Sequence, residues 1–160
     1  MTKVILMLRN NMTIKAVTFD LDDTLWPLYD VIMNSHKLSN DWLINKHPQM
    51  KEILFSTKER EMWQRLIKAE PSLANRLSEL RKKVIETLLV ENGVEISSAS
   101  MDSDKAFKIF LDERHKVTYF ENVLEVLARL KEVYQLGVLT NGNASIETLK
   151  IDHLFDFYLN

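Results

Sequence analysis

Two short apolar runs, each ending in polar residues, constrain the fold of this chain more than any other feature. The first covers residues 14–19 and precedes Asp20-Leu21-Asp22-Asp23-Thr24. The second covers residues 134–139 and precedes Thr140-Asn141-Gly142-Asn143. Short apolar runs bounded by turn-forming residues are typical of buried strands. We therefore predict two strands, the second of which leads into a helix over residues 144–151.

Asp20 and Asp22 are the candidate catalytic residues. Side chains two positions apart on a strand share a face, and ligand sites in open α/β sheets lie at the carboxyl ends of the strands. The two carboxylates are thus expected to converge on one phosphate-sized target, where one attacks and the other moves protons. Taken alone, the pattern is equally consistent with a turn or a helix cap, because Asp is common in both.

The end of the second strand carries the candidate phosphate-binding residues Thr140, Asn141 and Gly142. A hydroxyl, backbone N–H groups and the start of a helix suit an oxyanion such as phosphate. The alternative is a plain strand-to-helix turn with Asn143 as the N-cap. One strand end is acidic and the other is suited to anions, which favours a shared site over two unrelated turns.

With these two motifs the sequence resembles the haloacid dehalogenase-like hydrolase superfamily, specifically its phosphatases. The first family motif, a strand followed by DxDx[TV], is matched by Asp20, Asp22 and Thr24. The second, a strand that often ends in TNG, is matched by the residues that begin at Thr140. Dehalogenases of the family generally lack the second Asp, so the resemblance favours a phosphate ester over a halide.

The resemblance also implies a role for each residue. Asp20 would be the nucleophile that forms an aspartyl-phosphate, and Asp22 would protonate the leaving alcohol and then activate water. Thr140 would hold a phosphoryl oxygen. Mg²⁺ would be held by Asp20 and by the backbone carbonyl of Asp22. A hard cation is needed there because a carboxylate and a phosphate dianion repel each other.

Amphipathic segments between the motifs predict a small helical bundle. The third of them ends at Gly93, and a loop over residues 97–100 precedes the fourth. A further periodic helix over residues 123–130 leads into the second strand, and strand–helix–strand order indicates a parallel sheet. The expected fold class is α/β: a Rossmann-like parallel sheet core, residues 1–27 and 118–160, with an inserted α-helical cap, residues 28–117.

The resemblance implies parts for which the chain shows no counterpart. Residues 157–160 look like the start of a third strand. In the family a phosphate-binding lysine and a further strand with acidic residues follow; Lys150 precedes the third strand and does not match that lysine. We expect the N-terminal part of a phosphatase, whose core is incomplete at its C-terminus. Its exposed apolar sheet edge would pair with another copy or with a complementing C-terminal chain.

The leading function is a Mg²⁺-dependent phosphatase of a small phosphorylated metabolite. The strings TFDLDDTLW and LTNGNA look most similar to bacterial flavin mononucleotide phosphatases, which also act on a phosphorylated ribitylamino-pyrimidine. Three alternatives stay open: a non-catalytic remnant, one half of a two-chain enzyme, and a phosphomutase. Trp26 and Tyr29 follow the acidic motif and could line a pocket for a flat ring, although aromatics at helical spacing more often belong to the core.

Composition excludes several other classes of protein. The net charge of −2 gives no basis for nucleic-acid binding. Cysteine is absent, so there is no disulfide, thiolate metal site or Cys nucleophile, as fits a cytoplasmic protein. No apolar stretch approaches the ~18 residues of a membrane span. Residues 1–11 read either as an extra strand or as an extension, and the start at Met1 or Met12 stays open.

Overall fold

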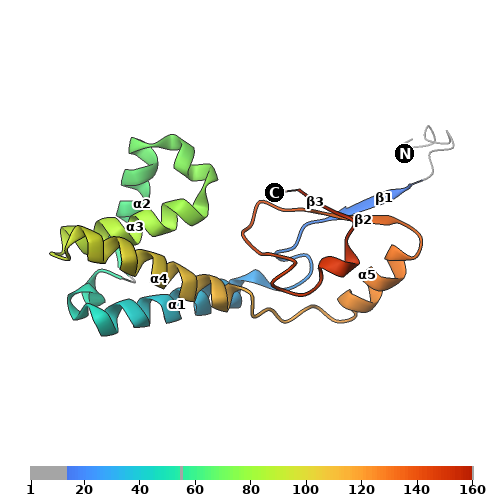
Figure 1. Cartoon of the computed structure of the whole chain (residues 1–160), viewed down its shortest axis with the longest axis horizontal. Helices are drawn as coiled ribbons and strands as arrows, with labels where there is room; N and C mark the ends of the chain where they lie inside the picture. The colour runs from blue at the N-terminus through green and yellow to red at the C-terminus, as the bar shows by residue number, and fades with distance from the viewer. Residues whose placement is uncertain (1–13, 55, 160) are drawn as a thin grey trace, which may run out of the picture. The chain divides into compact units, whose positions relative to one another are not determined.

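The structure is a computed structural model that describes residues 14–54 and 56–159 (Figure 1). The chain divides into two compact units. The first, which we call the α/β unit, contains residues 14–27 and 118–159; the second, the helical unit, contains residues 28–117. Residues 1–11, predicted to be either an extra strand or an extension, lie outside the described residues.

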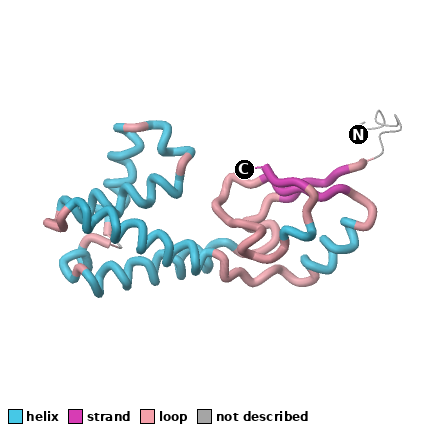
Figure 2. Tube along the Cα trace, viewed as in Figure 1, coloured by secondary structure: helices cyan, strands magenta, loops and turns pink. Residues whose placement is uncertain are grey.

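The α/β unit is built on a parallel sheet of three strands (Figure 2). Its elements are β1 (Ala16–Phe19), α5 (Val123–Lys131), β2 (Gln135–Leu139), the short 3₁₀ turn η3 (Asp152–Leu154) and β3 (Phe157–Leu159). The strand order is β1-β2-β3, and both pairs are parallel. The expected α/β fold with a parallel sheet and a helical insertion is therefore confirmed.

The middle strand forms the core of this sheet. Leu136 and Val138 of β2 are fully buried, and Leu127 of α5 is buried as well. Within the described residues β1 and β3 are the edges of the sheet, and their side chains are half-buried or exposed. Leu159 of β3, for example, exposes 56% of its surface.

The helix expected over residues 144–151 does not form. The segment makes a single turn in which the Leu149 N–H donates to the Ser145 carbonyl at 3.0 Å. The Ser145 hydroxyl accepts from the Thr148 N–H at 3.0 Å and so caps the start of this turn. Lys150 then adopts a left-handed backbone with φ 59°, which a helix does not continue through. The helix therefore ends after one turn.

Gly137 in β2 lies directly beneath the ring of its cross-strand partner Phe157. A Cβ at this position would stand 2.1 Å from Cε2 of Phe157. We expect Gly137→Ala to lower the free energy of unfolding by about 1–3 kcal/mol, the usual cost of overpacking, as measured by urea denaturation. In a Phe157→Ala background the same change should cost much less; an equal cost in both backgrounds would contradict this contact.

The helical unit contains the four predicted helices. They are α1 (Leu28–Lys46), α2 (Thr57–Ala69), α3 (Leu77–Glu91) and α4 (Ile96–Arg114), with the 3₁₀ turns η1 (Pro48–Glu52) and η2 (Pro71–Asn75) on either side of α2. Their apolar faces form one buried cluster that includes Leu43, Met50, Leu73, Leu80, Leu89 and Ala106. In the described residues no helix has both the length and the apolar character to cross a membrane.

The prediction of a loop over residues 97–100 is wrong, because α4 already begins at Ile96. Glu95 is the N-cap, and its carboxylate accepts a hydrogen bond from the Ser98 N–H at 3.1 Å and one from the Ser97 hydroxyl. Ala99 is then fully buried against the other helices. Serines favour loops mainly because they compete for backbone groups; here the cap satisfies the backbone and the serines join the first turn.

A buried carboxylate joins α1 to α4. Asp102 is 3% exposed and accepts hydrogen bonds from Lys46 Nζ at 2.5 Å and His47 Nε2 at 2.7 Å. Burial alone would raise the pKa of Asp102, but these two hydrogen bonds outweigh it and hold the pKa below its ordinary value. Farther along the pair, the Ser39 hydroxyl donates to the Ala106 carbonyl at 2.9 Å. The two helices are thus antiparallel.

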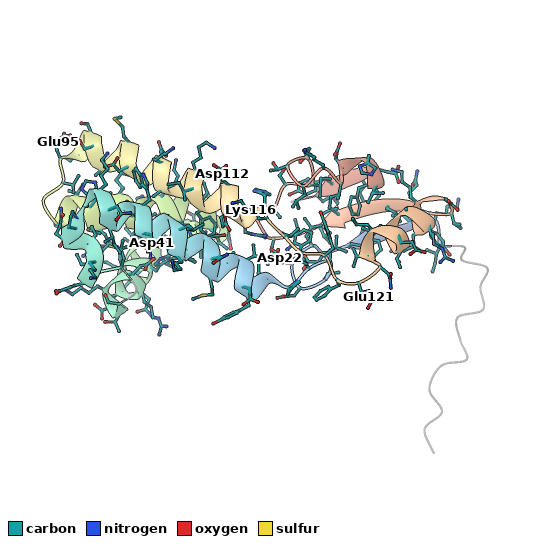
Figure 3. All side chains as sticks on the ribbon, turned by 90° about the horizontal axis from the view of Figure 1, so that it is seen from below. Asp22, Asp41, Glu95, Asp112, Lys116 and Glu121 are labelled. Atoms are coloured by element: carbon teal, nitrogen blue, oxygen red, sulfur yellow. The ribbon has the colours of Figure 1, made fainter. Side chains whose placement is uncertain are left out.

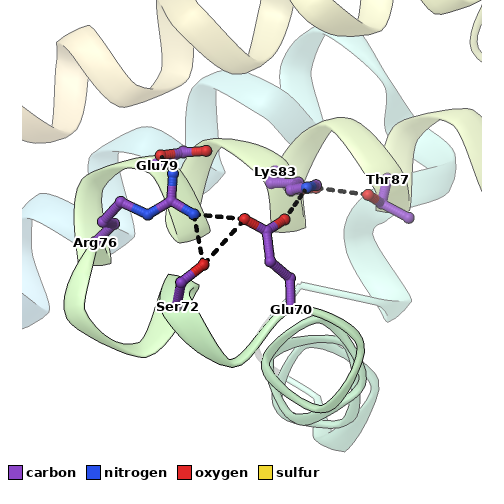
Figure 4. A network of polar contacts seen from close by, with 6 residues as sticks. All are labelled: Glu70, Ser72, Arg76, Glu79, Lys83 and Thr87. Carbon is purple, nitrogen blue, oxygen red and sulfur yellow. Dashed lines mark hydrogen bonds and ion pairs between the residues drawn. The ribbon is translucent and has the colours of Figure 1, made fainter.

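A surface network holds η2 against α3 (Figure 4). The Glu70 carboxylate accepts from Lys83 at 2.9 Å and from Arg76, which also donates to Glu79 at 2.6 Å. The bonds from Lys83 and then Arg76 lower the pKa of Glu70. These groups are about half exposed, so solvent screens the ion pairs and each contributes little to stability.

His36 of α1 lies against α3 and α4. Its Nε2 is 3.2 Å from Arg81 Nη2, and its ring meets Phe110 edge-on at 5.2 Å. Since arginine only donates, the His36 Nε2 accepts and the imidazole is neutral. Burial first, and then the charge of Arg81, lower the pKa of His36 to about 4. The Arg81 guanidinium in turn packs 3.9 Å from the centre of the Phe110 ring.

We expect the helical unit to lose stability as the pH falls from 6.5 toward 4. In that range the unfolded chain protonates His36, whose ordinary pKa is 6.5, while the folded chain does not. Linkage puts the loss at about 2 kcal/mol by pH 5. It is measured as the difference in urea midpoint between pH 7.5 and pH 5. His36→Gln keeps an acceptor and should reduce this difference; an unchanged difference would show that other groups cause it.

Candidate active site

The two sequence motifs lie together at the carboxyl end of the sheet. Asp20 directly follows β1 and Thr140 directly follows β2. The strands are parallel with Phe19 opposite Val138, so both motifs leave the sheet at its carboxyl end. Thr140 is buried and its N–H continues the ladder by donating to the Leu159 carbonyl at 3.2 Å.

Asp22 meets the loop that follows β2. A Cβ built on Gly142 would stand 2.7 Å from Asp22 Oδ2 and 3.4 Å from Thr140 Oγ1. The Gly142 N–H donates to Thr140 Oγ1 at 3.1 Å. The half-buried carboxylate of Asp22, labelled in Figure 3, therefore lies beside the backbone of Gly142 and close to the Thr140 hydroxyl. The absence of a side chain at Gly142 makes this approach feasible.

A tight turn fixes Asp22 in this place. The Leu25 N–H donates to the Leu21 carbonyl at 2.8 Å, and both leucine side chains are buried. Asp23 takes a left-handed backbone with φ 55°, a conformation that Asp tolerates better than most residues. Its N–H donates to the Trp26 carbonyl at 2.8 Å, which closes the turn.

Trp26 belongs to the core of the α/β unit. It is completely buried, whereas Tyr29 exposes 73% of its surface. The Trp26 indole Nε1–H donates to Asp22 Oδ1 at 3.0 Å, and its ring meets Tyr119 edge-on at 5.7 Å. This contact to Asp22 was not predicted from the sequence. Two features of the sequence point to it: Asp22 and Trp26 are four residues apart, and a buried indole N–H usually has a hydrogen-bond acceptor.

The structure thus places Asp22 and Thr140 around Gly142. Asp20 and Asn141 have exposed side chains at the same carboxyl edge of the sheet. The helix N-terminus expected behind them is absent, because residues 144–151 form only a turn. An anion at this end of the sheet would therefore meet the Thr140 hydroxyl and backbone N–H groups, without a helix dipole.

The carboxylates at the carboxyl end of the sheet could hold a metal ion. In the described ranges no three His, Cys, Asp or Glu side chains gather as a metal-binding group. Asp20 and Asp22 supply only oxygen ligands. That set fits Mg²⁺, which is usually bound through one or two carboxylates with retained waters and substrate phosphate, and it does not fit a zinc site, which needs more protein ligands.

The model of the haloacid dehalogenase-like hydrolase family matches residues 14–159, which is nearly all of the described chain. The chain belongs to this family. The matched region includes both motifs and the helical insertion between them. The family resemblance seen in the two motifs is therefore confirmed.

Two relatives in the haloacid dehalogenase-like family are clearly similar to the chain. 5-Amino-6-(5-phospho-D-ribitylamino)uracil phosphatase YigB of Escherichia coli K12 is 28% identical over 91% of the chain and 61% of its own length. A 2-haloacid dehalogenase from Pseudomonas syringae pv. Tomato DC3000 is 36% identical, with a TM-score of 0.86 over 92% of the chain and 64% of its own length. The chain spans less than two thirds of either relative.

A more distant structure supports the fold alone. YfnB of Bacillus subtilis, described as a HAD-hydrolase and solved with bound magnesium, is 14% identical with a TM-score of 0.51. The alignment covers 92% of the chain and 65% of YfnB. The shared architecture extends over both the sheet and the helical insertion.

Proposed function

We propose that this chain carries the nucleophile and the general acid of a Mg²⁺-dependent phosphatase that acts on a small phosphorylated metabolite. The observation that carries the proposal is the placement of the Asp22 carboxylate against Gly142, beside the Thr140 hydroxyl. A second carboxylate at that point serves proton transfer to an alcohol, for which a halide leaving group has no need. Membership of a hydrolase family supports the same reading.

The reaction would proceed in two steps on these residues. In the first, an Asp20 oxygen bonds to phosphorus while the bond to the alcohol oxygen breaks, and Asp22 gives its proton to that oxygen. In the second, Asp22 takes a proton from water, the water oxygen bonds to phosphorus, and the bond to Asp20 breaks. Thr140 Oγ1 already accepts from the Gly142 N–H, so its own O–H can donate to a phosphoryl oxygen.

Asp20, with the backbone carbonyl of Asp22, would hold Mg²⁺. When bound, the ion would neutralise the charge that builds up between a carboxylate and a phosphate dianion. The protein groups orient the phosphoryl group for attack, which is the main contribution of protein to phosphoryl transfer. Asn141 and Gly142 would add contacts to the phosphoryl oxygens.

The substrate we propose is flavin mononucleotide or a related ribityl phosphate. The support is the similarity to YigB, whose name describes a phosphatase of a phosphorylated ribitylamino-uracil. Residues 28–117 would serve as the cap that selects this substrate. A small phosphorylated metabolite is the proposed partner, together with a second copy or a complementing chain at the sheet edges, because exposed apolar edge strands readily pair.

The test is phosphate release from flavin mononucleotide, from the ribitylamino-uracil phosphate and from p-nitrophenyl phosphate, each with Mg²⁺ and with EDTA. Mg²⁺-dependent release, fastest on a ribityl phosphate, is the expected result. Folded protein that releases no phosphate from any of them would refute the phosphatase proposal and favour a non-catalytic remnant. Transfer of the phosphoryl group to a second position of the product would indicate a phosphomutase. Sedimentation of the same sample tests pairing between two copies at the sheet edges, which a strict monomer would refute in favour of a complementing chain.

One observation favours a second candidate function. The structure with 36% identity is described as a 2-haloacid dehalogenase, and an Asp nucleophile can also displace a halide from carbon. Chloride release from 2-chloropropionate is therefore measured on the same protein sample. Chloride release without phosphate release would favour a dehalogenase over the proposed phosphatase. Asp22 would then not act as a general acid, because a halide leaves without a proton.

A further inference from the structure

The indole of Trp26 makes a direct contact with the proposed general acid. Trp26 Nε1 donates to Asp22 Oδ1 at 3.0 Å, and the backbones of the two residues form an isolated β-bridge. Trp26 is completely buried, so its N–H has no access to bulk water. A buried indole N–H without an acceptor is costly, so this hydrogen bond ties the orientation of Asp22 to the fold.

The Trp26 indole also packs against a second aromatic ring. The Tyr119 ring meets it edge-on, with ring centres 5.7 Å apart and planes at 79°. The next residue, Phe120, donates its N–H to the Leu25 carbonyl at 2.9 Å. The segment that precedes α5 thus packs against the turn that bears Asp22. The Tyr119 ring therefore packs against the indole that contacts the Asp22 carboxylate.

The two oxygens of Asp22 have different surroundings. Oδ1 accepts from the Trp26 indole, whereas Oδ2 lies on the side of the loop after β2, where a Cβ on Gly142 would be 2.7 Å away. The loop side holds Thr140, the residue proposed to contact the phosphoryl group. The carboxylate is therefore turned so that one oxygen faces the protein core and the other faces the proposed reaction centre.

We propose that Trp26 is a positioning residue that makes Oδ2 of Asp22 the oxygen that exchanges its proton with the leaving group. This rests on the proposed function. The indole can only donate, so it suits Oδ1 both when Asp22 is ionised and when Oδ2 carries the proton. A proton on Oδ1 would face the indole N–H. In the first step the Oδ2–H bond breaks and an O–H bond forms on the departing alcohol oxygen.

The first test compares leaving groups in Trp26→Phe, which keeps a ring against Tyr119 and removes the N–H. Alkyl phosphates such as flavin mononucleotide need a proton on the departing oxygen; p-nitrophenyl phosphate needs it far less. We expect kcat on the alkyl ester to fall about 10- to 100-fold, less than the ~10²–10⁴-fold that a general acid contributes, because the acid is misoriented and not removed. The fall on the aryl ester should be much smaller, and KM should change little. Equal falls on both esters would overturn the proposal.

Phe155→Leu is the control. Phe155 is buried in the α/β unit just before β3 and belongs to neither motif. The next residue, Asp156, donates its N–H to the Leu136 carbonyl at the amino end of the sheet. Loss of an aromatic ring there should leave the ratio of the two kcat values as in the parent chain. A ratio that changes as much in Phe155→Leu as in Trp26→Phe would also overturn the proposal, because the effect would then not depend on Asp22.

The second test needs no turnover. The indole ¹H–¹⁵N resonances of Trp26, Trp42 and Trp63 are assigned by single Phe variants, and Asp22→Ala is then compared with the parent chain. We expect the Trp26 resonance to move and the other two to stay. A Trp26 resonance that stays in place would overturn the contact. If no ester is turned over, the phosphatase proposal fails, while this measurement still decides whether Trp26 orients Asp22.

Discussion

Replacing Asp20 by asparagine is expected to lower phosphate release by at least ~10³-fold, the scale seen when a nucleophile that acts as part of a unit is removed. Asparagine has nearly the same shape but cannot form an acyl phosphate. Asp20 is exposed at the end of β1, so the change should leave the folded state intact. The effect is measured as kcat on p-nitrophenyl phosphate and on flavin mononucleotide.

Asp23→Asn provides the matched control for this change. Asp23 is exposed, lies three residues farther along and has a left-handed backbone that asparagine also adopts readily. The Asp23→Asn variant should retain most of the activity. A second measurement separates chemistry from binding: radioactive phosphate from labelled substrate should become attached to the parent chain in a hydroxylamine-sensitive form, and not to Asp20→Asn. Labelling of both chains would place the nucleophile elsewhere.

Replacing Gly142 by alanine is expected to reduce kcat about 10- to 100-fold, because a displacement of about 1 Å at a reacting group has effects of this size. The new methyl group would stand 2.7 Å from Asp22 Oδ2, closer than a carbon and an oxygen can approach. Either Asp22 turns away from its place or the loop after β2 shifts. Both movements separate the carboxylate from Thr140.

A double variant that also carries Asp22→Ala distinguishes this steric clash from a general loss of structure. Asp22→Ala removes the carboxylate, so Gly142→Ala should have little further effect in that background on the residual activity or on the urea midpoint. Gly93→Ala is the control for glycine replacement elsewhere, because nothing lies within 4 Å of a Cβ there; its positive φ should lower stability without lowering kcat. Full activity in Gly142→Ala would contradict the close approach.

The elements that position the site could be predicted from apolar spacing alone. β1 and β2 follow from runs that are too short for helices, and α5 follows from its periodic face. The convergence of the two motifs at one edge then follows from parallel pairing. What could not be predicted is the contact between Asp22 and Gly142, because it depends on the left-handed backbone of Asp23, for which Asp is only one of several suitable residues.

Two predictions about helices were wrong for the same reason. Residues 97–100 were expected to form a loop and residues 144–151 a helix, yet the structure shows the reverse. In both segments one residue decides the outcome: the Glu95 side chain caps the first, and the left-handed backbone of Lys150 ends the second after one turn. A cap contributes about 1 kcal/mol, which is enough to outweigh the weak intrinsic preferences of a few serines.

The antiparallel pairing of α1 with α4 has a consequence for how the chain folds. β1 and β2 are neighbours in space but are separated in sequence by the whole inserted unit, and closing such a long loop is entropically costly. His36 contacts Phe110 and Ser39 contacts Ala106, so the insertion begins and ends at the same end of its helix pair. Once the helices collapse, their two ends are close together and the effective loop becomes short. Local helical contacts should therefore form first and bring β1 to β2, and loosening the α1–α4 pair should slow assembly of the sheet even though no residue of the sheet is changed.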